Sequence, residues 1–215
     1  MKKFYLPLLL PLVMMPLASQ AATYTKVVGT LVPDYPDLSG LSSTITVSGD
    51  TTAITGVQVV LDLSGTQTAG WSGDIYCYVI HNSVVSVLLN RIGRTSTNLA
   101  GNGNNSMVLT LSDGATTDVH AATPPTGALV GTFLPDGRAV DPSVSLDTTP
   151  RTASLGVFNT GNSNGDWTLF VSDAASGGTM TLNSWQLTIN PVPEPSVAGL
   201  GVLGLASLVM RRRRR

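Results

Sequence analysis

Apolar residues between positions 23 and 191 recur at every second position, in short runs separated by Gly, Asp, Asn and Pro. Alternation of this kind is typical of β-strands that bury one face. No apolar stripe with the period of a helix crosses this region. Strands are predicted at Lys26–Val32, Ser43–Val47, Ile54–Leu63, Asp74–His81, Val84–Leu89, Ser106–Leu111, Ala153–Phe158, Trp167–Ser172 and Met180–Ile189. Short strands joined by turns predict an all-β fold, an antiparallel β-sandwich or jelly roll.

The first 22 residues have the pattern of a secretory signal peptide. A basic start at Met1 to Lys3 precedes an apolar run from Phe4 to Leu17, and small residues follow from Ala18 to Ala22. We expect cleavage after Ala21 or Ala22. Residues 1–22 are therefore assigned to export, and residues 23–191, called the body below, to the folded domain.

The last 24 residues, 192–215, join an uncharged run to a block of like charge. Ser196 to Met210 carries no charged side chain and would reach only about 22 Å as a helix, against a hydrocarbon core of about 30 Å. Pro193 and Pro195 interrupt any helix that enters from the body. The arginines favour the cytoplasmic side. The pattern predicts a short transmembrane anchor, and the alternative is a solvated basic tail after a buried helix.

The same segment resembles the PEP-CTERM sorting signal of Gram-negative bacteria. The matching residues are Val192, Pro193, Glu194 and Pro195, then the apolar run, then Arg211, Arg212, Arg213, Arg214 and Arg215. The resemblance implies an exosortase-type enzyme as partner, which cuts near the Pro-Glu-Pro and releases or re-anchors the body. It further implies a transient stay at the inner membrane, a final place at the cell surface or outside the cell, and an association with exopolysaccharide or biofilm.

Without the two terminal segments the chain is acidic. Only Lys26, Arg91, Arg94, Arg138 and Arg151 remain as basic residues, against thirteen acids with Glu194 included, a formal charge of −8. Such a body is unsuited to nucleic acid, which requires a basic face. Twelve of the acids are Asp. Asp in a β-protein is favoured in turns, where its side chain bonds the local backbone.

The body also resembles the proprotein-convertase P-domain, the P/Homo B domain, from about Gly29 to Asn190. The resemblance rests on these segments: Ile54–Leu63, Ser72–Ile75, Gly131–Gly137, Leu155–Phe158, Asn164–Asp173 and Thr181–Ile189. It implies a jelly-roll sandwich like that of galactose-binding domains. P-domains stabilise subtilisin-like proteases, so the resemblance also implies a second function, that of a detached accessory domain for a separately encoded protease.

Catalysis is not predicted. The two histidines, His81 and His120, stand in unrelated segments, and no G-x-S-x-G elbow accompanies them. Cys77 alternates with aromatic residues in a strand and is predicted to be a small buried side chain. One Cys and two separate His give no zinc-ligand spacing.

Calcium is a possible cofactor. The Asp-rich turns offer the oxygen ligands that calcium takes, and Asn162 to Asp166 is similar to half of a calcium loop that lacks the closing Glu. The P-domain resemblance implies Asp74, Asp113 and Asp173 as its ligands. The alternative is that all three aspartates only cap turns.

Trp71 is the candidate ligand-binding aromatic residue. It lies in the turn Ala69–Gly73, where an exposed ring could stack on a sugar or, alternatively, cap the core. Trp167 and Trp185 stand in register with apolar strand positions and are predicted to be core. Two functions follow: a non-enzymatic surface or matrix protein that binds polysaccharide, or the accessory domain of a protease.

Overall fold

The computed structural model describes residues 21–190 except 38, 51–52, 66–69 and 123–126. Contacts within the chain group Ala21–Pro193 into one compact unit, which holds the whole hydrophobic core and is described here by itself. The sorting motif, the apolar run 196–210 and the arginines lie outside the described residues. Among the residues described, no helix is long and apolar enough to cross a membrane.

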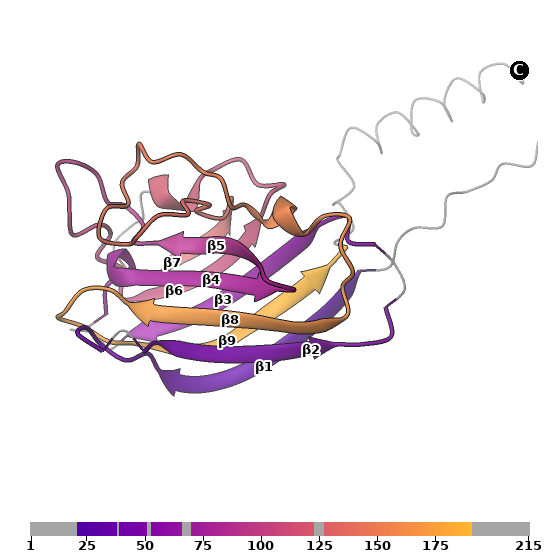
Figure 1. Ribbon diagram of the computed structural model, residues 1–215. Coiled ribbons are helices and arrows are strands. Elements are labelled where there is room, and N and C mark those ends of the chain that lie inside the picture. The colour runs from indigo at the N-terminus through magenta and orange to yellow at the C-terminus, as the bar shows by residue number, and fades with distance from the viewer. Residues whose placement is uncertain (1–20, 38, 51–52, 66–69, 123–126, 191–215) are drawn as a thin grey trace, which may run out of the picture. The chain divides into compact units, whose positions relative to one another are not determined.

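The body is built almost wholly of strands, which form two sheets (Figure 1). Alternation of buried and exposed side chains runs along most of them, as the sequence predicts. The strands are β1 (Ala22–Leu31), β2 (Leu41–Val47), β3 (Val57–Gly65), β4 (Ile75–His81), β5 (Val84–Asn90), β6 (Ser106–Ser112), β7 (Leu129–Phe133), β8 (Gly165–Asp173) and β9 (Met180–Ile189); short 3-10 helices are η1 (Ser72–Asp74), η2 (Val119–Ala121) and η3 (Leu155–Phe158).

The strand order interleaves the two halves of the chain. The five-stranded sheet has the order β1-β9-β3-β6-β7, and the four-stranded sheet has the order β2-β8-β4-β5. With β7 set aside, this is the strand order of a jelly roll made of two Greek keys. The prediction of a purely antiparallel sandwich needs one correction, because β7 runs parallel to β6. A parallel neighbour needs a long connection, and the segment between β6 and β7 supplies it.

A single core of aliphatic side chains and two tryptophans fills the space between the sheets. Trp167 and Trp185 are fully buried, as predicted from their register. Each indole N–H finds an acceptor: Trp167 donates to the carbonyl of Ser163 at 2.9 Å, and Trp185 donates to Ser43 Oγ at 2.9 Å. The second of these bonds joins β9 of one sheet to β2 of the other.

Two segments differ from their sequence-based assignment. Leu129–Phe133 forms β7, although no strand is predicted there, and Leu155–Phe158 forms η3 where a strand is predicted. Asp113 explains the second difference, because its carboxylate accepts the backbone N–H groups of Leu155 and Gly156 and so holds the start of η3. The remaining predicted strands are confirmed, with ends shifted by a few residues.

The ends of the body meet at one strand pair. Ala22 of β1 is the register partner of Ile189 of β9. The residue after β9, Asn190, is buried and has a φ of +54°. Its side-chain oxygen accepts the backbone N–H of Thr55 at 2.6 Å, and its own N–H donates to Gly56 at 2.8 Å. Asn190 therefore fastens the end of β9 to the loop before β3.

Candidate functional site

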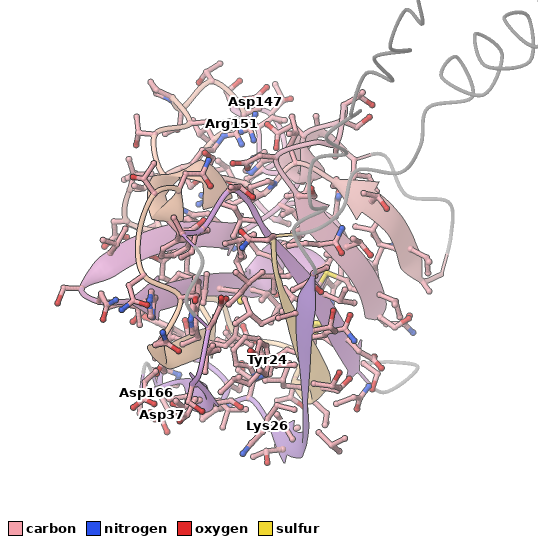
Figure 2. The ribbon with its side chains drawn as sticks, turned by 90° about the vertical axis from the view of Figure 1, so that its right-hand side faces the viewer. Tyr24, Lys26, Asp37, Asp147, Arg151 and Asp166 are labelled. Carbon is pink, nitrogen blue, oxygen red and sulfur yellow. The ribbon has the colours of Figure 1, made fainter. Side chains whose placement is uncertain are left out.

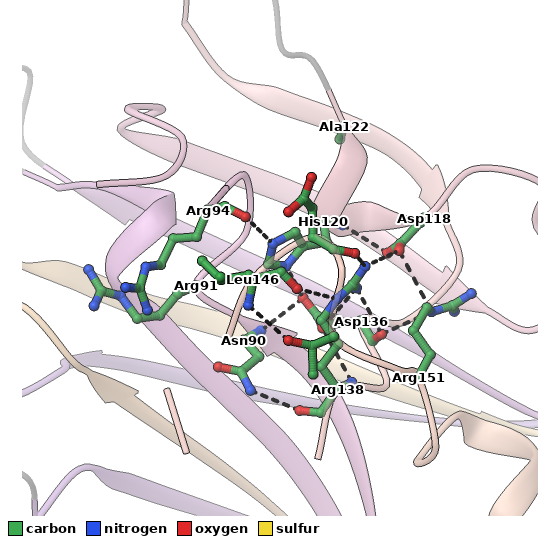
Figure 3. Close-up of polar contacts among 12 residues, drawn as sticks. Asn90, Arg91, Arg94, Asp118, His120, Ala122, Asp136, Arg138, Leu146 and Arg151 are labelled. Carbon is green, nitrogen blue, oxygen red and sulfur yellow. Dashed lines mark hydrogen bonds and ion pairs between the residues drawn. The ribbon is translucent and has the colours of Figure 1, made fainter. Parts of the chain in front are cut away.

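Buried charged side chains connect the loops that lie beside β5, the edge strand of the four-stranded sheet (Figure 3). Asp136 is fully buried and bonds His120 Nδ1 at 2.8 Å and Arg138 Nη1 at 3.2 Å. Arg138 also donates to Asp118 at 2.9 Å. Burial opposes the charge of Arg138, but Asp118 and Asp136 more than offset this effect, so its pKa lies above the ordinary value. The loops of residues 113–122 and 134–154 are thus connected through ion pairs, and the loop of residues 91–104 joins them through hydrogen bonds to backbone carbonyls.

His120 has no ring nitrogen left for acid–base chemistry in this network. Its Nδ1 faces Asp136, and its Nε2 lies 2.9 Å from the carbonyl oxygen of Arg94. A carbonyl accepts only from a protonated nitrogen, so Nε2 carries a hydrogen. A general base needs an accessible nitrogen beside a nucleophile. His120 is instead held between two oxygen acceptors.

His81 is held in a similar way at the end of β4. Its Nδ1 lies 3.0 Å from the carbonyl oxygen of Asp166, and its Nε2 lies 2.7 Å from that of Asn162. The ring stacks on Trp167 with centroids 4.1 Å apart and planes 5° from parallel. Both histidines therefore serve as connectors between segments.

The predicted calcium ligands are only partly brought together. Asp74 and Asp173 are neighbours, because Asp173 is the register partner of Ile75 and Ala174 N–H donates to the carbonyl of Asp74. Asp113 lies past the far end of β6, where it holds η3. Asp74 lies beside the loop that precedes β6, since Gly73 N–H donates to Asn102. The length of a seven-residue strand, roughly 20 Å, therefore separates Asp113 from the other two.

A different aspartate, Asp34, joins Asp74 and Asp173. Burial raises the pKa of Asp173 to about 7, and the nearby charges of Asp74 and Asp34 add to this shift. The pKa of Asp74 is also raised by burial, although Arg91 Nη2, 3.2 Å from its Oδ1, opposes the rise. Oδ1 of Asp34 and Oδ2 of Asp173 are buried without a hydrogen-bond partner. Within the described ranges, no group of three or more His, Cys, Asp or Glu has an arrangement that could hold a metal ion.

Trp71 lies at the surface, in the turn before η1. Its side chain is 42% exposed, and one face of the indole covers Gly103, where a Cβ would stand 3.1 Å from Cζ3 of the ring. The ring therefore caps the loop of residues 101–104 and presents its other side to solvent. The ring is thus partly exposed, as the sugar-stacking hypothesis requires, and its covered side packs on a loop. Sugar stacking by Trp71 stays a prediction.

Three other aromatic rings gather on the outer face of the four-stranded sheet. Along β4, Ile75, Cys77 and Val79 point into the core, so Tyr76 and Tyr78 point outward. Phe170 of β8 is the register partner of Tyr78. Their ring centroids lie 4.9 Å apart with planes inclined by 22°, and the Tyr76 and Tyr78 centroids lie 5.7 Å apart. We call Tyr76, Tyr78 and Phe170 the aromatic face.

The aromatic face and the loop network were not identified from the sequence. For the aromatic face a signal existed, because two similar segments, Gly73–Val79 and Gly165–Val171, each start with Gly-Asp and continue into a strand. The structure makes these segments antiparallel neighbours. For the loop network the sequence shows only isolated Asp and Arg residues in turn-rich segments.

Comparison with known proteins identifies no family. No family model matches the sequence, and no curated protein matches it. Two solved structures are similar in fold at 15% identity: the serine protease of Aeromonas sobria, with a TM-score of 0.43 over 82% of this chain and 28% of that chain, and the complex of the Aeromonas sobria serine protease with its chaperone, with a TM-score of 0.42 over 80% of this chain and 27% of that chain. The chain thus spans little more than a quarter of these proteins. At such scores the likeness is to the general arrangement of strands and says nothing of function.

Proposed function

We propose that this chain is an exported, non-enzymatic protein of the cell surface or extracellular matrix, whose sandwich serves as a binding and structural module. An exosortase-type enzyme would process it at residues 192–195 after a transient stay at the inner membrane. Extracellular polysaccharide is the proposed partner of the body. The resemblance of residues 192–215 to PEP-CTERM signals supports the route.

The non-enzymatic assignment rests on one observation: the two histidines and the cysteine of the body are all engaged in holding the fold. His81 and His120 each place both ring nitrogens against oxygen atoms. Burial raises the pKa of the Cys77 thiol, which suppresses the reactive thiolate form. The groups that most often act in acid–base or nucleophilic catalysis are thereby engaged in holding the fold.

The ends of β1 and β9 support removal of both terminal segments. Because Ala22 pairs with Ile189, a cut after Ala21 leaves β1 complete, and a cut beyond residue 191 leaves Asn190 and its bonds intact. Of the two expected cleavage positions, the one after Ala21 keeps the partner of Ile189, and the one after Ala22 would remove it.

A second candidate is the accessory domain of a separately encoded protease. Two valines on the outer face of the five-stranded sheet favour contact with a protein: Val108 and Val130 are register partners and are 44% and 64% exposed. This candidate would be favoured over the first if a subtilisin-like protease co-purified with the chain, and if that protease became less stable when Val130 of this chain was replaced by Asp.

The first prediction tests the route. The intact mass of protein released from the surface of producing cells is expected to correspond to a start at Ala22 or Thr23 and to lack Arg211 to Arg215. Cells without the exosortase-type enzyme are expected to retain the longer species in the membrane fraction. Wild-type cells that release a form still carrying the arginines would contradict the proposal.

A further inference from the structure

We propose that the aromatic face binds a polysaccharide chain that carries no acidic groups. The inference deepens the proposed function by naming the surface and the class of glycan, and it rests on that function for its choice of a polysaccharide as the occupant.

The three rings lie outside the core, on the outer face of the four-stranded sheet. Tyr76, Tyr78 and Phe170 are half-buried, whereas Cys77 and Leu169, which precede or separate them along β4 and β8, are completely buried. Tyr78 and Phe170 stack on each other and Tyr76 is tilted by 56° to Tyr78, so the aromatic face offers a ligand the outer edges of the stacked pair and the tilted ring of Tyr76. Tyr and Phe are rigid side chains that lose little conformational freedom on binding. A sugar ring offers such side chains its C–H groups, with hydroxyls at the rim. Tyrosine combines both needs, because its ring is apolar and its hydroxyl is polar.

Gly40 keeps Phe170 in place. It has a φ of +63°, and a Cβ at this position would stand only 2.4 Å from Cζ of Phe170. The backbone before β2 therefore lies directly against the ring, and any larger side chain would displace it. A ring that is fixed before binding loses less entropy when a ligand arrives.

Hydroxyl groups surround the rings on the same face. Thr44 of β2 and Thr168 of β8 are register partners whose Oγ1 atoms lie 2.9 Å apart, and Ser42 is the register partner of Phe170. Hydroxyls both donate and accept hydrogen bonds, so they suit the hydroxyls of a sugar. A mostly apolar surface with a few polar groups is the usual composition of a ligand site.

The charges near the aromatic face exclude an acidic occupant. The exposed carboxylate of Asp166 lies on the outer face of β8, and Asp141 is close enough to Tyr76 to act on its phenol. In the described part of the chain, no basic side chain is exposed on this face: Arg91 follows Asn90, the register partner of Tyr76, and Arg94 donates to the carbonyl of Pro142 next to Asp141, but both arginines are buried. Lys26 belongs to β1 of the other sheet, far from Arg151 (Figure 2), and the arginines bond carbonyl or carboxylate oxygens of the loops. Uronic acids, phosphates or sulfates would meet the carboxylates of Asp166 and Asp141 without an exposed cation among the described residues to pair with, whereas a neutral glycan meets rings and hydroxyls.

Affinity electrophoresis of the body with Ala22 retained, residues 22–191, tests the inference. Native gels would contain hydroxyethylcellulose, laminarin, galactomannan, or the neutral and acidic fractions of the exopolysaccharide from the producing organism, with alginate as an acidic comparison. At least one neutral glycan is expected to retard the wild type. Tyr78→Ala and the milder Tyr76→Ser are expected to weaken this retardation about tenfold or more. Val130→Ala, on the other sheet, and Trp71→Ala, in the turn before η1, are matched controls that should keep it.

Melting curves accompany each variant, so that loss of folding is separated from loss of binding; if Tyr78→Ala unfolds, Tyr76→Ser decides. Three outcomes would overturn the inference: no retardation by any neutral glycan, retardation by acidic glycans alone, or loss of binding in Trp71→Ala with Tyr76→Ser unaffected. If the intact mass shows processing at both termini but the gels give one of these three outcomes, the proposed export route is retained and the glycan surface is rejected. If the gels show binding but the termini are not processed, the glycan surface is retained and the export route is rejected.

Discussion

Buried charges take the place of apolar contacts in the longest loop of this protein. The segment of residues 134–154 contains Asp, Pro, Thr and Arg and forms no strand or helix. A loop of this length without secondary structure is uncommon in a compact domain, so specific contacts must hold it in place. Asp136 supplies them, since the carboxylate contacts His120 and Arg138 and its backbone carbonyl accepts from Arg151.

Asp136→Asn is expected to lower the free energy of unfolding by about 3–5 kcal/mol, because the charge of Arg138 then stays buried with a partner removed. Asp166→Asn is the matched control: this aspartate is exposed, and the change should cost within about 0.5 kcal/mol. Denaturant unfolding of both variants measures the difference. Equal, small losses would mean that the network contributes little to stability.

Asp173 makes the stability of the body depend on pH. Its pKa rises to about 7 in the folded protein, from 3.8, so the folded state holds a proton that the unfolded chain has released. Stability is therefore complete below about pH 4 and falls as the pH rises toward 7. Asp173→Asn should match the wild type at pH 4 and exceed it at pH 8, by up to about 4 kcal/mol.

Asp141→Asn provides the opposite sign for comparison. Hydrogen bonds from Ser143 lower the pKa of this exposed carboxyl, so its small contribution is lost as the pH falls. Melting curves from about pH 2 to pH 8 for both variants test the assignment, because the Asp141 contribution is lost only below its ordinary pKa of 3.8, whereas the Asp173 effect lies between about pH 4 and pH 8. A wild type whose stability is constant over this range would contradict it.

Among the elements, strands with one apolar parity could be oriented directly from the sequence, whereas a strand with two apolar parities needs a further signal. In β2, Ile45 and Val47 alternate with threonines, which fixes the buried face. In β4 both parities are apolar or aromatic, and the burial predicted for Cys77 is what places Val79 inward and Tyr78 outward; the structure confirms this orientation. The sequence does not show that β8 lies beside β4, and this pairing is what brings Phe170 to Tyr78 and forms the aromatic face.

Two further misses have local causes. β7 has only five residues with a central glycine, and its partner β6 lies parallel to it, so neither length nor a hairpin turn signals it. The network around Asp136 depends on loops brought together by the sheets, and no spacing within the sequence encodes that proximity. Asp34 joined Asp74 and Asp173 for the same reason.

Trp185→Ala tests the assignment of β9 to the centre of the body. The side chain is 1% exposed, so truncation should cost about 3–5 kcal/mol. Trp71→Ala should cost less than half as much, because one side of that indole is already in solvent. Similar losses in the two variants would contradict the placement of either ring.

At the scale of the whole molecule, charge is distributed unevenly. Thirteen acids and five basic residues lie between Thr23 and Pro195. Four of the basic residues are arginines, and each of them donates hydrogen bonds to oxygens within the body. The net negative charge favours solubility and opposes compactness. Cations in the surroundings are therefore expected to matter for stability.

Calcium remains a prediction. Of its three predicted ligands the structure brings only Asp74 and Asp173 together, and the described carboxylates alone do not form a metal site, so a calcium ion there would need further oxygens from backbone carbonyls or water. Calcium at about ten times its dissociation constant would add about 1.4 kcal/mol. Melting in EDTA is compared with melting in about 5 mM calcium, a level suited to extracellular sites. Asp173→Asn should abolish the gain and Asp113→Asn should keep it. Superimposable wild-type curves would contradict calcium binding. The ion pair with Arg91 would then be the described interaction that balances the charge of Asp74.

The pairing of Ala22 with Ile189 determines how the body would respond to tension. Separating the two ends peels β1 from β9 one pair at a time, which needs little force. A load that enters at the aromatic face and leaves through Asn190 instead pulls β9 along its axis, between β1 and β3. Antiparallel ladder bonds are perpendicular to the strands, so many of them resist that pull together. If the proposed glycan binds the aromatic face, a sandwich held through the end of β9 is expected to resist the pull better than one held through both of its ends.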